Sequence, residues 1–318
     1  MPSIADFIKK LDNPKAPIAY PKMTLYESTS GDNVIDLKPA VQERVRGGQK
    51  IVGPLQVIRR PGLGDKVFAL AACSTFAKQY PEVELTFSGL ETDTWLPKVI
   101  DWLPIGLNPH CNTVANLDNT PCNSGDRAKL MGDILGVDVT TIEFPIKIPR
   151  KQHNIPKPYY VFVPFAAMAG PRSLPIVTIK ELLSYVPLRV ALTDAKKYDF
   201  ANLSSNVVNC TGMDMMGLIA LIADSAGVIA VDTGVPWLAA AMGKPCLIMF
   251  SYIRSAERTM TCHNVWGVEP QVLCAKSCGD HIGTRPQCRW KESVPVCMAG
   301  YSPSFVRHLM REFERMTK

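Results

Sequence analysis

The segment at residues 227–250 constrains the fold of this chain more than any other part of the sequence. It reads GVIAVDTGVPWLAAAMGKPCLIMF. Residues 228–231 form a continuous apolar run, which is typical of a strand buried on both faces. A turn follows, and Pro236 suits the first position of a short alanine-rich helix that Gly243 ends. Because residues 246–250 form a second apolar run, the segment predicts one strand–helix–strand unit of a parallel sheet.

A unit of this kind leaves backbone N–H groups and the positive end of a helix dipole just beyond the first strand. Asp232, Thr233 and Gly234 occupy this place in the sequence. In open α/β sheets an anionic ligand binds there. The alternative is that Asp232 and Thr233 are ordinary turn and N-cap residues. The segment alone therefore indicates a fold and a candidate anion site, and leaves the ligand open.

Length and charge limit the classes of function. At 318 residues the chain suits two domains of about 150 residues each. The net charge of +6 permits an anionic partner but does not require one. No apolar run is long enough for a transmembrane helix, and the first residues lack the basic and then apolar pattern of a signal peptide. We therefore expect a cytoplasmic protein, and peripheral contact with a membrane stays open.

A second strand–turn–helix unit begins near residue 55. Residues 55–59 predict a strand, 66–79 a helix with one apolar face, and 83–87 the next strand. The turn between the first strand and the helix contains Gly62 and Gly64, which let the backbone approach a ligand closely. The turn lacks the full dinucleotide fingerprint, so the sequence does not support a nicotinamide-dependent enzyme.

The region between the two units is less regular. Residues 94–103 and 127–135 predict helices, the second closed by Gly136, while 108–125 is polar and irregular. Residues 144–158 carry four prolines and five basic side chains if histidine is counted, which makes this the best candidate for a linker. Strands and helices alternate again after it, as expected of a second α/β domain.

Four segments in the right order resemble the heptosyltransferase-like glycosyltransferases, the ADP-heptose:lipopolysaccharide heptosyltransferase family. Residues 213–250 resemble the nucleotide-sugar half, with its Asp-Thr/Ser-Gly turn and Gly-x-Pro. Residues 59–87 resemble the N-terminal motif Arg-x-x-Gly-x-Gly-Asp. PRSLP at 171–175 resembles a Lys-Arg-Trp-Pro segment, and the end from Cys297 resembles Cys-Met-x-x-Ile-x-Pro. Together the matches cover roughly residues 55–318.

The resemblance implies a GT-B fold, an α/β architecture in which two Rossmann-like domains face a central cleft. The predicted parts are an N-terminal extension (1–50), an acceptor-side domain (51–150), a nucleotide-sugar-binding domain (151–301) with a cysteine-rich segment (262–297), and a C-terminal helix (302–318) that packs back across the domains.

The resemblance also implies an inverting, metal-independent sugar transfer. Asp65 matches the position of the general base, and a carboxylate is ionised and able to accept a proton at pH 7. The acceptor-side turn contains Gly62 and Gly64. The implied donor-binding residues are Arg172, Met213, Asp232, Thr233, Gly234 and Trp237. The structural alternatives are that Asp65 only caps its helix, that Arg172 is a solvated loop charge, and that Met213 fills a gap in the core.

Trp237 departs from the family pattern, which usually has histidine at this position. An indole offers one N–H donor and a large flat face, whereas an imidazole can bond a phosphate or a sugar oxygen. Stacking of a sugar on Trp237 and plain packing are both compatible with the sequence. The change leaves the donor sugar open, and heptose in particular.

Four cysteines crowd into the last quarter of the chain, with the spacing C-x3-C-x9-C-x8-C. They are Cys274, Cys278, Cys288 and Cys297. Four thiolates suit a structural zinc site, although the spacing is not the paired C-x2-C form. Reduced core thiols and disulfides are the alternatives.

The leading hypothesis is a glycosyltransferase that uses a nucleotide-diphosphate sugar as co-substrate and needs no catalytic metal. Basic residues in the linker and the C-terminal region admit an acceptor on an envelope saccharide or on a hydroxymethylated base of phage DNA. The alternative is a non-catalytic protein of GT-B shape that binds sugar nucleotides or serves assembly.

Overall fold

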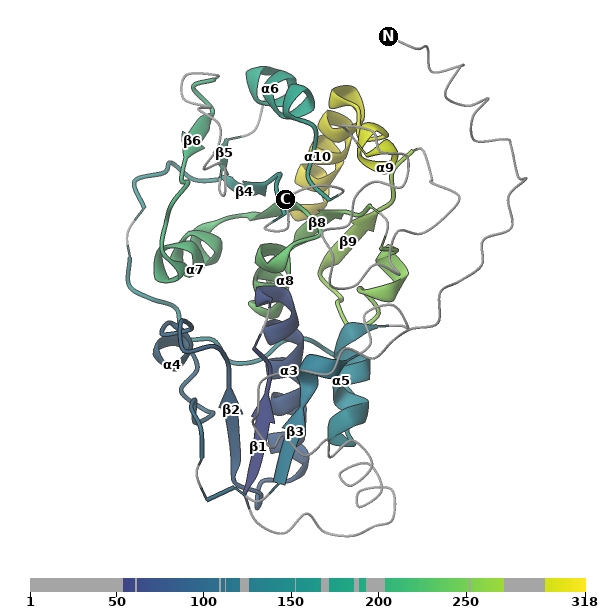
Figure 1. Cartoon of the computed structure of the whole chain (residues 1–318). Coiled ribbons are helices and arrows are strands. Elements are labelled where there is room, and N and C mark those ends of the chain that lie inside the picture. Colours follow the sequence, from purple (N-terminus) through teal and green to yellow (C-terminus); the bar gives the residue numbers. More distant parts are fainter. Residues whose placement is uncertain are drawn as a thin grey trace, which may run out of the picture. The chain divides into compact units, whose positions relative to one another are not determined.

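A computed structural model of the chain describes residues 54–60, 62–108, 110–111, 113–120, 126–151, 153–166, 172–185, 189–192, 204–251, 253–271 and 295–318. These residues form two sheets in which the paired strands run parallel (Figure 1). The sheets are built from the apolar runs that the sequence contains, because a parallel strand is covered on both faces. The predicted extension at 1–50 and three of the clustered cysteines (Cys274, Cys278 and Cys288) lie outside the described residues.

The larger sheet has six strands in the order β6-β5-β4-β7-β8-β9. From β4 the chain moves outward through β5 and β6, then returns to β7 and moves outward on the other side. The direction therefore reverses between β4 and β7, the place where open α/β sheets bind ligands. The strands are β4 Tyr160–Val163, β5 Val190–Leu192, β6 Val207–Asn209, β7 Gly227–Val231, β8 Cys246–Met249 and β9 Val265–Val268.

Each face of this sheet has its own apolar core. Along β7, Val228 and Ala230 belong to the core that includes α7 and α8, whereas Ile229 and Val231 belong to the core that includes α6, α9 and α10. This alternation follows from the two-residue period of a strand. The helices are α6 Ile176–Tyr185, α7 Met215–Asp224, α8 Gly234–Ala241, α9 Val296–Ala299 and α10 Pro303–Thr317, with a 3-10 turn η2 at Ser255–Glu257.

The smaller sheet has the order β2-β1-β3. It corrects two predictions: β3 lies in a region expected to be irregular, and α4 is much shorter than the predicted helix at 94–103. The chain leaves α4 at Ile100 in an extended conformation, and the Val99 carbonyl accepts a bond from the Lys147 N–H of the linker. The elements are β1 Leu55–Ile58, α3 Leu63–Gln79, β2 Leu85–Ser88, α4 Leu96–Val99, β3 Thr113–Asn116, η1 Leu117–Asn119 and α5 Arg127–Leu135.

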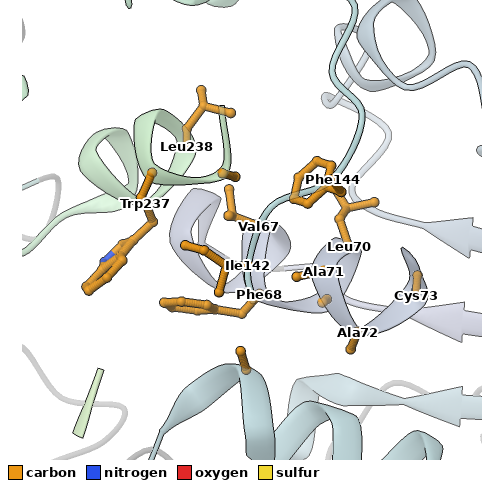
Figure 2. Close-up of a cluster of buried hydrophobic side chains, with 14 of the residues drawn as sticks. Val67, Phe68, Leu70, Ala71, Ala72, Cys73, Ile142, Phe144, Trp237 and Leu238 are labelled. Carbon is orange, nitrogen blue, oxygen red and sulfur yellow. The ribbon is translucent and has the colours of Figure 1, made fainter. Parts of the chain in front are cut away.

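Helix α3 of the smaller sheet packs directly on helix α8 of the larger one. Figure 2 shows the apolar cluster at this contact, where Val67 and Phe68 of α3 lie near Trp237 and Leu238 of α8. One continuous core therefore includes residues of both sheets. This packing fixes the helices that begin just after β1 and β7.

The C-terminal helix α10 packs on α6 and on the second face of the larger sheet. Phe313 lies against Tyr160 of β4, with ring centroids 5.8 Å apart. These contacts join the C-terminal helix to the second predicted domain, and the crossing back to the first domain stays a prediction. No helix in the part of the chain that the structure describes is long and apolar enough to cross a membrane.

Candidate active site

The turn after β7 carries three of the predicted donor residues. Asp232 directly follows the strand and is only 4% exposed, and Thr233 is the N-cap of α8. The Thr233 side chain makes no capping hydrogen bond, so its hydroxyl is not committed to the helix end. The helix begins at Gly234, two residues earlier than predicted, so Pro236 stands in the first turn rather than at its first position. Because proline lacks an N–H, the donors at this helix end come from the residues before it.

Arg172 lies beyond the end of β4, the strand that neighbours β7. Its Nη1 atom is 3.6 Å from Oδ2 of Asp232. The other carboxylate oxygen, Oδ1, accepts a hydrogen bond of 3.1 Å from Nε1 of Trp237. The structure thus brings three predicted donor residues together where the direction of the sheet reverses.

The turn after β1 carries the predicted base. Helix α3 begins at Leu63 and its N-cap is Gly62, so Asp65 lies within the first turn and does not cap the helix. This excludes the N-cap explanation for Asp65. Gly62 has a φ of 73°, and a Cβ added there would lie 3.1 Å from Oδ2 of Asp65. A glycine at this position therefore permits the turn and leaves space for the carboxylate.

Two arginines hold the Asp65 carboxylate. Nε of Arg127 donates to Oδ1 at 2.9 Å, and Nη2 of Arg59 pairs with Oδ2. Burial tends to raise the pKa of Asp65, but the positive charges of Arg127 and Arg59 outweigh it and hold the pKa below its ordinary value. The side chain is still 30% exposed. Asp65 is therefore an ionised, firmly oriented carboxylate that a ligand can reach.

Both arginines are themselves fixed. Nη1 of Arg59 donates to the carbonyls of Leu117 and Asp118 at 3.0 Å each. Nη1 of Arg127 donates to the carbonyl of Thr120 at 2.7 Å. These carbonyls lie just after β3, which is the neighbour of β1. The Asp65 site is thus assembled at the carboxyl edge of the smaller sheet, as the Asp232 site is at that of the larger one.

The two turns touch one another. A Cβ added to Gly234 would lie 2.6 Å from Cβ of Leu63, and one added to Gly64 would lie 2.9 Å from Cδ1 of Trp237. An added side chain would meet the start of α3 at Gly234 and the Trp237 side chain at Gly64, so the close approach of the two turns favours glycine at both places. The candidate base and the candidate leaving-group site therefore belong to one site built from both sheets.

The two remaining donor predictions have different surroundings. Trp237 is 3% exposed and packs between Phe68 and Phe250, with ring centroids 5.1 and 6.2 Å away. Its ring face is covered by these contacts, which favours packing over sugar stacking. Met213 is half-buried against the core, and its side chain lies over Gly217 of α7. Its predicted place beside the nucleobase stays a prediction.

Sequence reasoning missed Arg59 and Arg127 as part of the site. Arg127 is 1% exposed and occupies the first position of α5. A cation at a helix N-terminus is unfavourable because it meets the positive end of the dipole. An arginine directly after the N-cap Asp126 was therefore a signal that a specific acidic partner lies nearby.

The cysteine cluster is only partly visible. Cys297 is buried within α9, in the core on the second face of the larger sheet. Within the described ranges, no three or more histidine, cysteine, aspartate or glutamate side chains are arranged to hold a metal ion. The other three cysteines of the cluster lie outside those ranges.

Comparison with known proteins gives one family match. Residues 194–276 match the model described as Glycosyltransferase family 9 (heptosyltransferase). This segment includes the turn after β7 and α8. No curated protein matches the chain.

Several solved structures share the fold. The iron-containing dodecameric glycosyltransferase TibC from enterotoxigenic E. coli H10407 has a TM-score of 0.65 at 13% identity, over 83% of this chain and 77% of that one. TibC has also been solved with ADP-D-β-D-heptose. The E. coli ADP-heptose LPS heptosyltransferase II has a TM-score of 0.54 at 12% identity, over 83% of this chain and 99% of that one. A family 9 glycosyltransferase from Veillonella parvula has a TM-score of 0.51 at 12% identity, over 68% and 86%.

Proposed function

Because this chain is a heptosyltransferase-like glycosyltransferase with the GT-B fold, we propose that it moves a sugar from a nucleotide-diphosphate donor to an acceptor hydroxyl, with inversion at the anomeric carbon. The observation that carries this proposal is the direct contact between the turn of Asp65 and the turn of Asp232. A base on one side and an anion site on the other are what an in-line displacement needs.

Asp65 acts as the general base in this proposal. It takes the proton of the acceptor hydroxyl while the hydroxyl oxygen forms a bond to the anomeric carbon, and the bond from that carbon to the donor phosphate oxygen breaks. The arginine pairs orient the carboxylate but also lower its basicity. General-base help is typically worth about 10²–10⁴ in rate, and a base with a lowered pKa belongs near the lower limit.

The turn after β7 takes the departing nucleoside diphosphate. The free N–H groups at the start of α8, the hydroxyl of Thr233 and the guanidinium of Arg172 supply donors and positive charge. Arginine can bind a phosphate with two parallel bonds. With these groups the step proposed here uses no catalytic metal. ADP-heptose is the first donor to test because TibC has been solved with ADP-D-β-D-heptose.

Among the two acceptor classes we propose a saccharide. Two basic linker residues are already paired with acidic residues of the second domain: Lys151 with Asp214 at 2.6 Å and Lys157 with Asp224 at 2.7 Å. Near the C-terminus Arg315 is paired with Glu312. These pairs reduce the positive charge that a nucleic acid would need. The cytoplasmic location expected from the sequence stays a prediction.

The four clustered cysteines are proposed as ligands of one structural metal ion. Four thiolates suit tetrahedral zinc or iron, and TibC is described as iron-containing. The buried position of Cys297 in the core on the second face of the larger sheet fits a structural ion. Elemental analysis of the purified chain and of Cys297→Ser tests this proposal. Zinc or iron that is lost in the variant supports it, and wild-type protein without either metal contradicts it.

Release of nucleoside diphosphate tests the function. The full chain is incubated with a panel of nucleotide sugars that begins with ADP-heptose, and with either a lipopolysaccharide-core saccharide or hydroxymethylated DNA as acceptor. Asp65→Asn is compared with Asp101→Asn, which changes an exposed aspartate of the same domain. We expect turnover with the saccharide that Asp65→Asn abolishes and Asp101→Asn keeps. Tight donor binding without Asp65-dependent turnover on either acceptor would favour the non-catalytic alternative.

A further inference from the structure

Trp237 lies at the contact between the two halves of the site. Its indole packs against Phe68 of α3 (Figure 2) and against Phe250 beyond β8. It also fills the space in front of Gly64, where an added Cβ would lie 2.9 Å from the indole Cδ1. The side chain is therefore in contact on both flanks, with the two aromatic rings and with the start of α3.

The indole N–H of Trp237 is hydrogen-bonded to a buried carboxylate. Nε1 donates to Oδ1 of Asp232 at 3.1 Å, and that carboxylate is 4% exposed. Oδ2 of Asp232 is 3.6 Å from Nη1 of Arg172, which is longer than a hydrogen bond. Arg172 is thus attracted by the charge of Asp232 but is not hydrogen-bonded to it.

A buried carboxylate needs partners, and the indole supplies one without neutralising the charge. If the N–H were missing, Asp232 would draw the guanidinium of Arg172 into direct contact. The arginine would then have fewer donors for an anion beyond the end of β4. The indole N–H therefore keeps Arg172 available.

We propose that Trp237 is a positioning residue. Through its hydrogen bond to Asp232 it sets the position of the Arg172 guanidinium, and its packing holds Asp232 and Arg172 in place relative to the turn of Asp65. This inference rests on the proposed function, since it assigns to Arg172 the phosphates of the departing nucleotide. It gives the tryptophan, which stands where the similar family usually has histidine, a role in nucleotide binding that does not involve sugar stacking.

The hydrogen bond is tested first, by NMR of protein labelled with ¹⁵N in its tryptophan indoles. The signal that disappears in Trp237→Phe belongs to Trp237. We expect it to exchange slowly with solvent and to shift when Asp232→Asn removes the negative charge. A rapidly exchanging signal that Asp232→Asn leaves in place would overturn the proposal.

The effect on ligand binding is tested with the nucleoside diphosphate that the wild type releases, by calorimetry. Trp237→Phe keeps an aromatic ring and removes the N–H, and we expect affinity about 10- to 100-fold weaker, the range for a bond to a charged group. In the Asp232→Asn background the same substitution should have little effect, because no carboxylate remains to capture Arg172. Phe250→Leu is the control for lost packing and should lower the melting temperature without changing the affinity.

The outcomes separate the two proposals. If Trp237→Phe weakens binding equally in both backgrounds, or acts only on the melting temperature as Phe250→Leu does, the positioning role is wrong while the proposed function stands. If the wild type binds no nucleoside diphosphate, the proposed function fails and the inference fails with it. Should Trp237→Phe not fold, Arg172→Gln, Asp232→Asn and their combination measure the coupling between Asp232 and Arg172 with the indole intact. Additive effects of those two substitutions would contradict the proposal.

Discussion

The turns after β1 and β7 follow the same strand–turn–helix pattern and differ in chemistry. Each follows a buried parallel strand, contains glycine and leads into a helix, and each presents one aspartate. Asp65 is partly exposed and held by two arginines. Asp232 is buried, bonded to a neutral indole and only approached by an arginine. The difference shows that the strand–turn–helix pattern fixes where a carboxylate lies, while residues distant in the sequence fix what it can do.

The comparison also explains the direction of the proposed reaction. The Asp65 carboxylate is 30% exposed and able to accept a proton from a ligand, whereas the Asp232 carboxylate is buried against Trp237 and Arg172. An anion binds more readily beside Arg172, which has donors to spare, than beside Arg127, whose Nε and Nη1 are already bonded. We therefore assign the proposed base to the turn after β1 and the proposed leaving-group site to the turn after β7.

The largest expected effect separates the two turns by function. Asp65→Asn should lower kcat by about 10² or more, within the range for loss of a general base, and leave the affinity for the nucleoside diphosphate unchanged. Arg172→Gln should weaken that affinity about 10- to 100-fold through loss of a charged hydrogen bond. Steady-state kinetics and calorimetry measure the two quantities.

If Asp65→Asn and Arg172→Gln both changed only kcat, or both changed only the nucleotide affinity, the two turns would not have separate functions. Asp101→Asn is the control for Asp65→Asn, because it removes an exposed carboxylate of the same domain. Arg150→Gln is the control for Arg172→Gln, because it removes an exposed positive charge of the linker.

The fold was largely predictable because its strands are continuous apolar runs. The unit from β7 to β8 was recognised from its buried runs and its glycines, and α5 begins and ends as predicted. Strand β3 was missed because its four residues, TVAN, include one fully buried position and no long apolar run. Helix α4 was overpredicted because a backbone contact with the linker, which no local pattern reveals, ends it early.

The site was only partly predictable. Asp65, Asp232 and Arg172 were identified by resemblance, and the structure brings Arg172 to Asp232. The Arg127–Asp65 pair joins residues 62 positions apart, so no local spacing encodes it. The indole N–H of Trp237 could be expected to find an acceptor, but only the fold shows that the acceptor is Asp232.

The next largest effect concerns the contact between the two turns. Gly234→Ala should lower the free energy of unfolding by about 1–3 kcal/mol, because the added methyl group would meet the Cβ of Leu63 at 2.6 Å and the backbone N of Gly64 at 3.0 Å. Gly64→Ala should have a smaller effect, because its methyl group meets side-chain atoms of Trp237, which can shift. Urea denaturation of both variants gives the order. The reverse order would mean that the indole is the more rigid partner.

The pH dependence tests the arginine clamp on Asp65. Because the pKa of Asp65 is held below its ordinary value of 3.8, activity that depends on its ionised form should not fall between about pH 7 and pH 5. The stability contributed by the clamp is present above that ordinary value and is lost as pH falls through the lowered pKa. Replacing Arg127 by glutamine removes the largest lowering charge and should move the acidic limb of kcat/KM upward.

Arg60→Gln is the matched control for the clamp. Arg60 is 48% exposed and pairs with Asp118 rather than Asp65, so the acidic limb should stay in place. If Arg127→Gln does not fold, the pH profile of the wild type still decides the point. An acidic limb above pH 5 in the wild type would exclude Asp65 as the titrating base.

The smallest expected effect tests whether the part of the chain that forms the larger sheet supports the turn after β1. Asp126 caps α5 just before Arg127, and it also accepts a bond of 3.2 Å from the hydroxyl of the buried Thr261. Thr261→Val removes that bond and leaves the two capping bonds within α5, so the free energy of unfolding should fall by about 0.5–1.5 kcal/mol. Thr259→Val is the control, because among the residues that the structure describes the Thr259 hydroxyl bonds only the carbonyl of Ser255 in its own loop. If the Thr261 variant also lowers kcat while nucleotide affinity is unchanged, the orientation of Asp65 depends on contacts from both sheets. Equal changes in the two valine variants would mean that the hydrogen bond to Asp126 contributes nothing of its own.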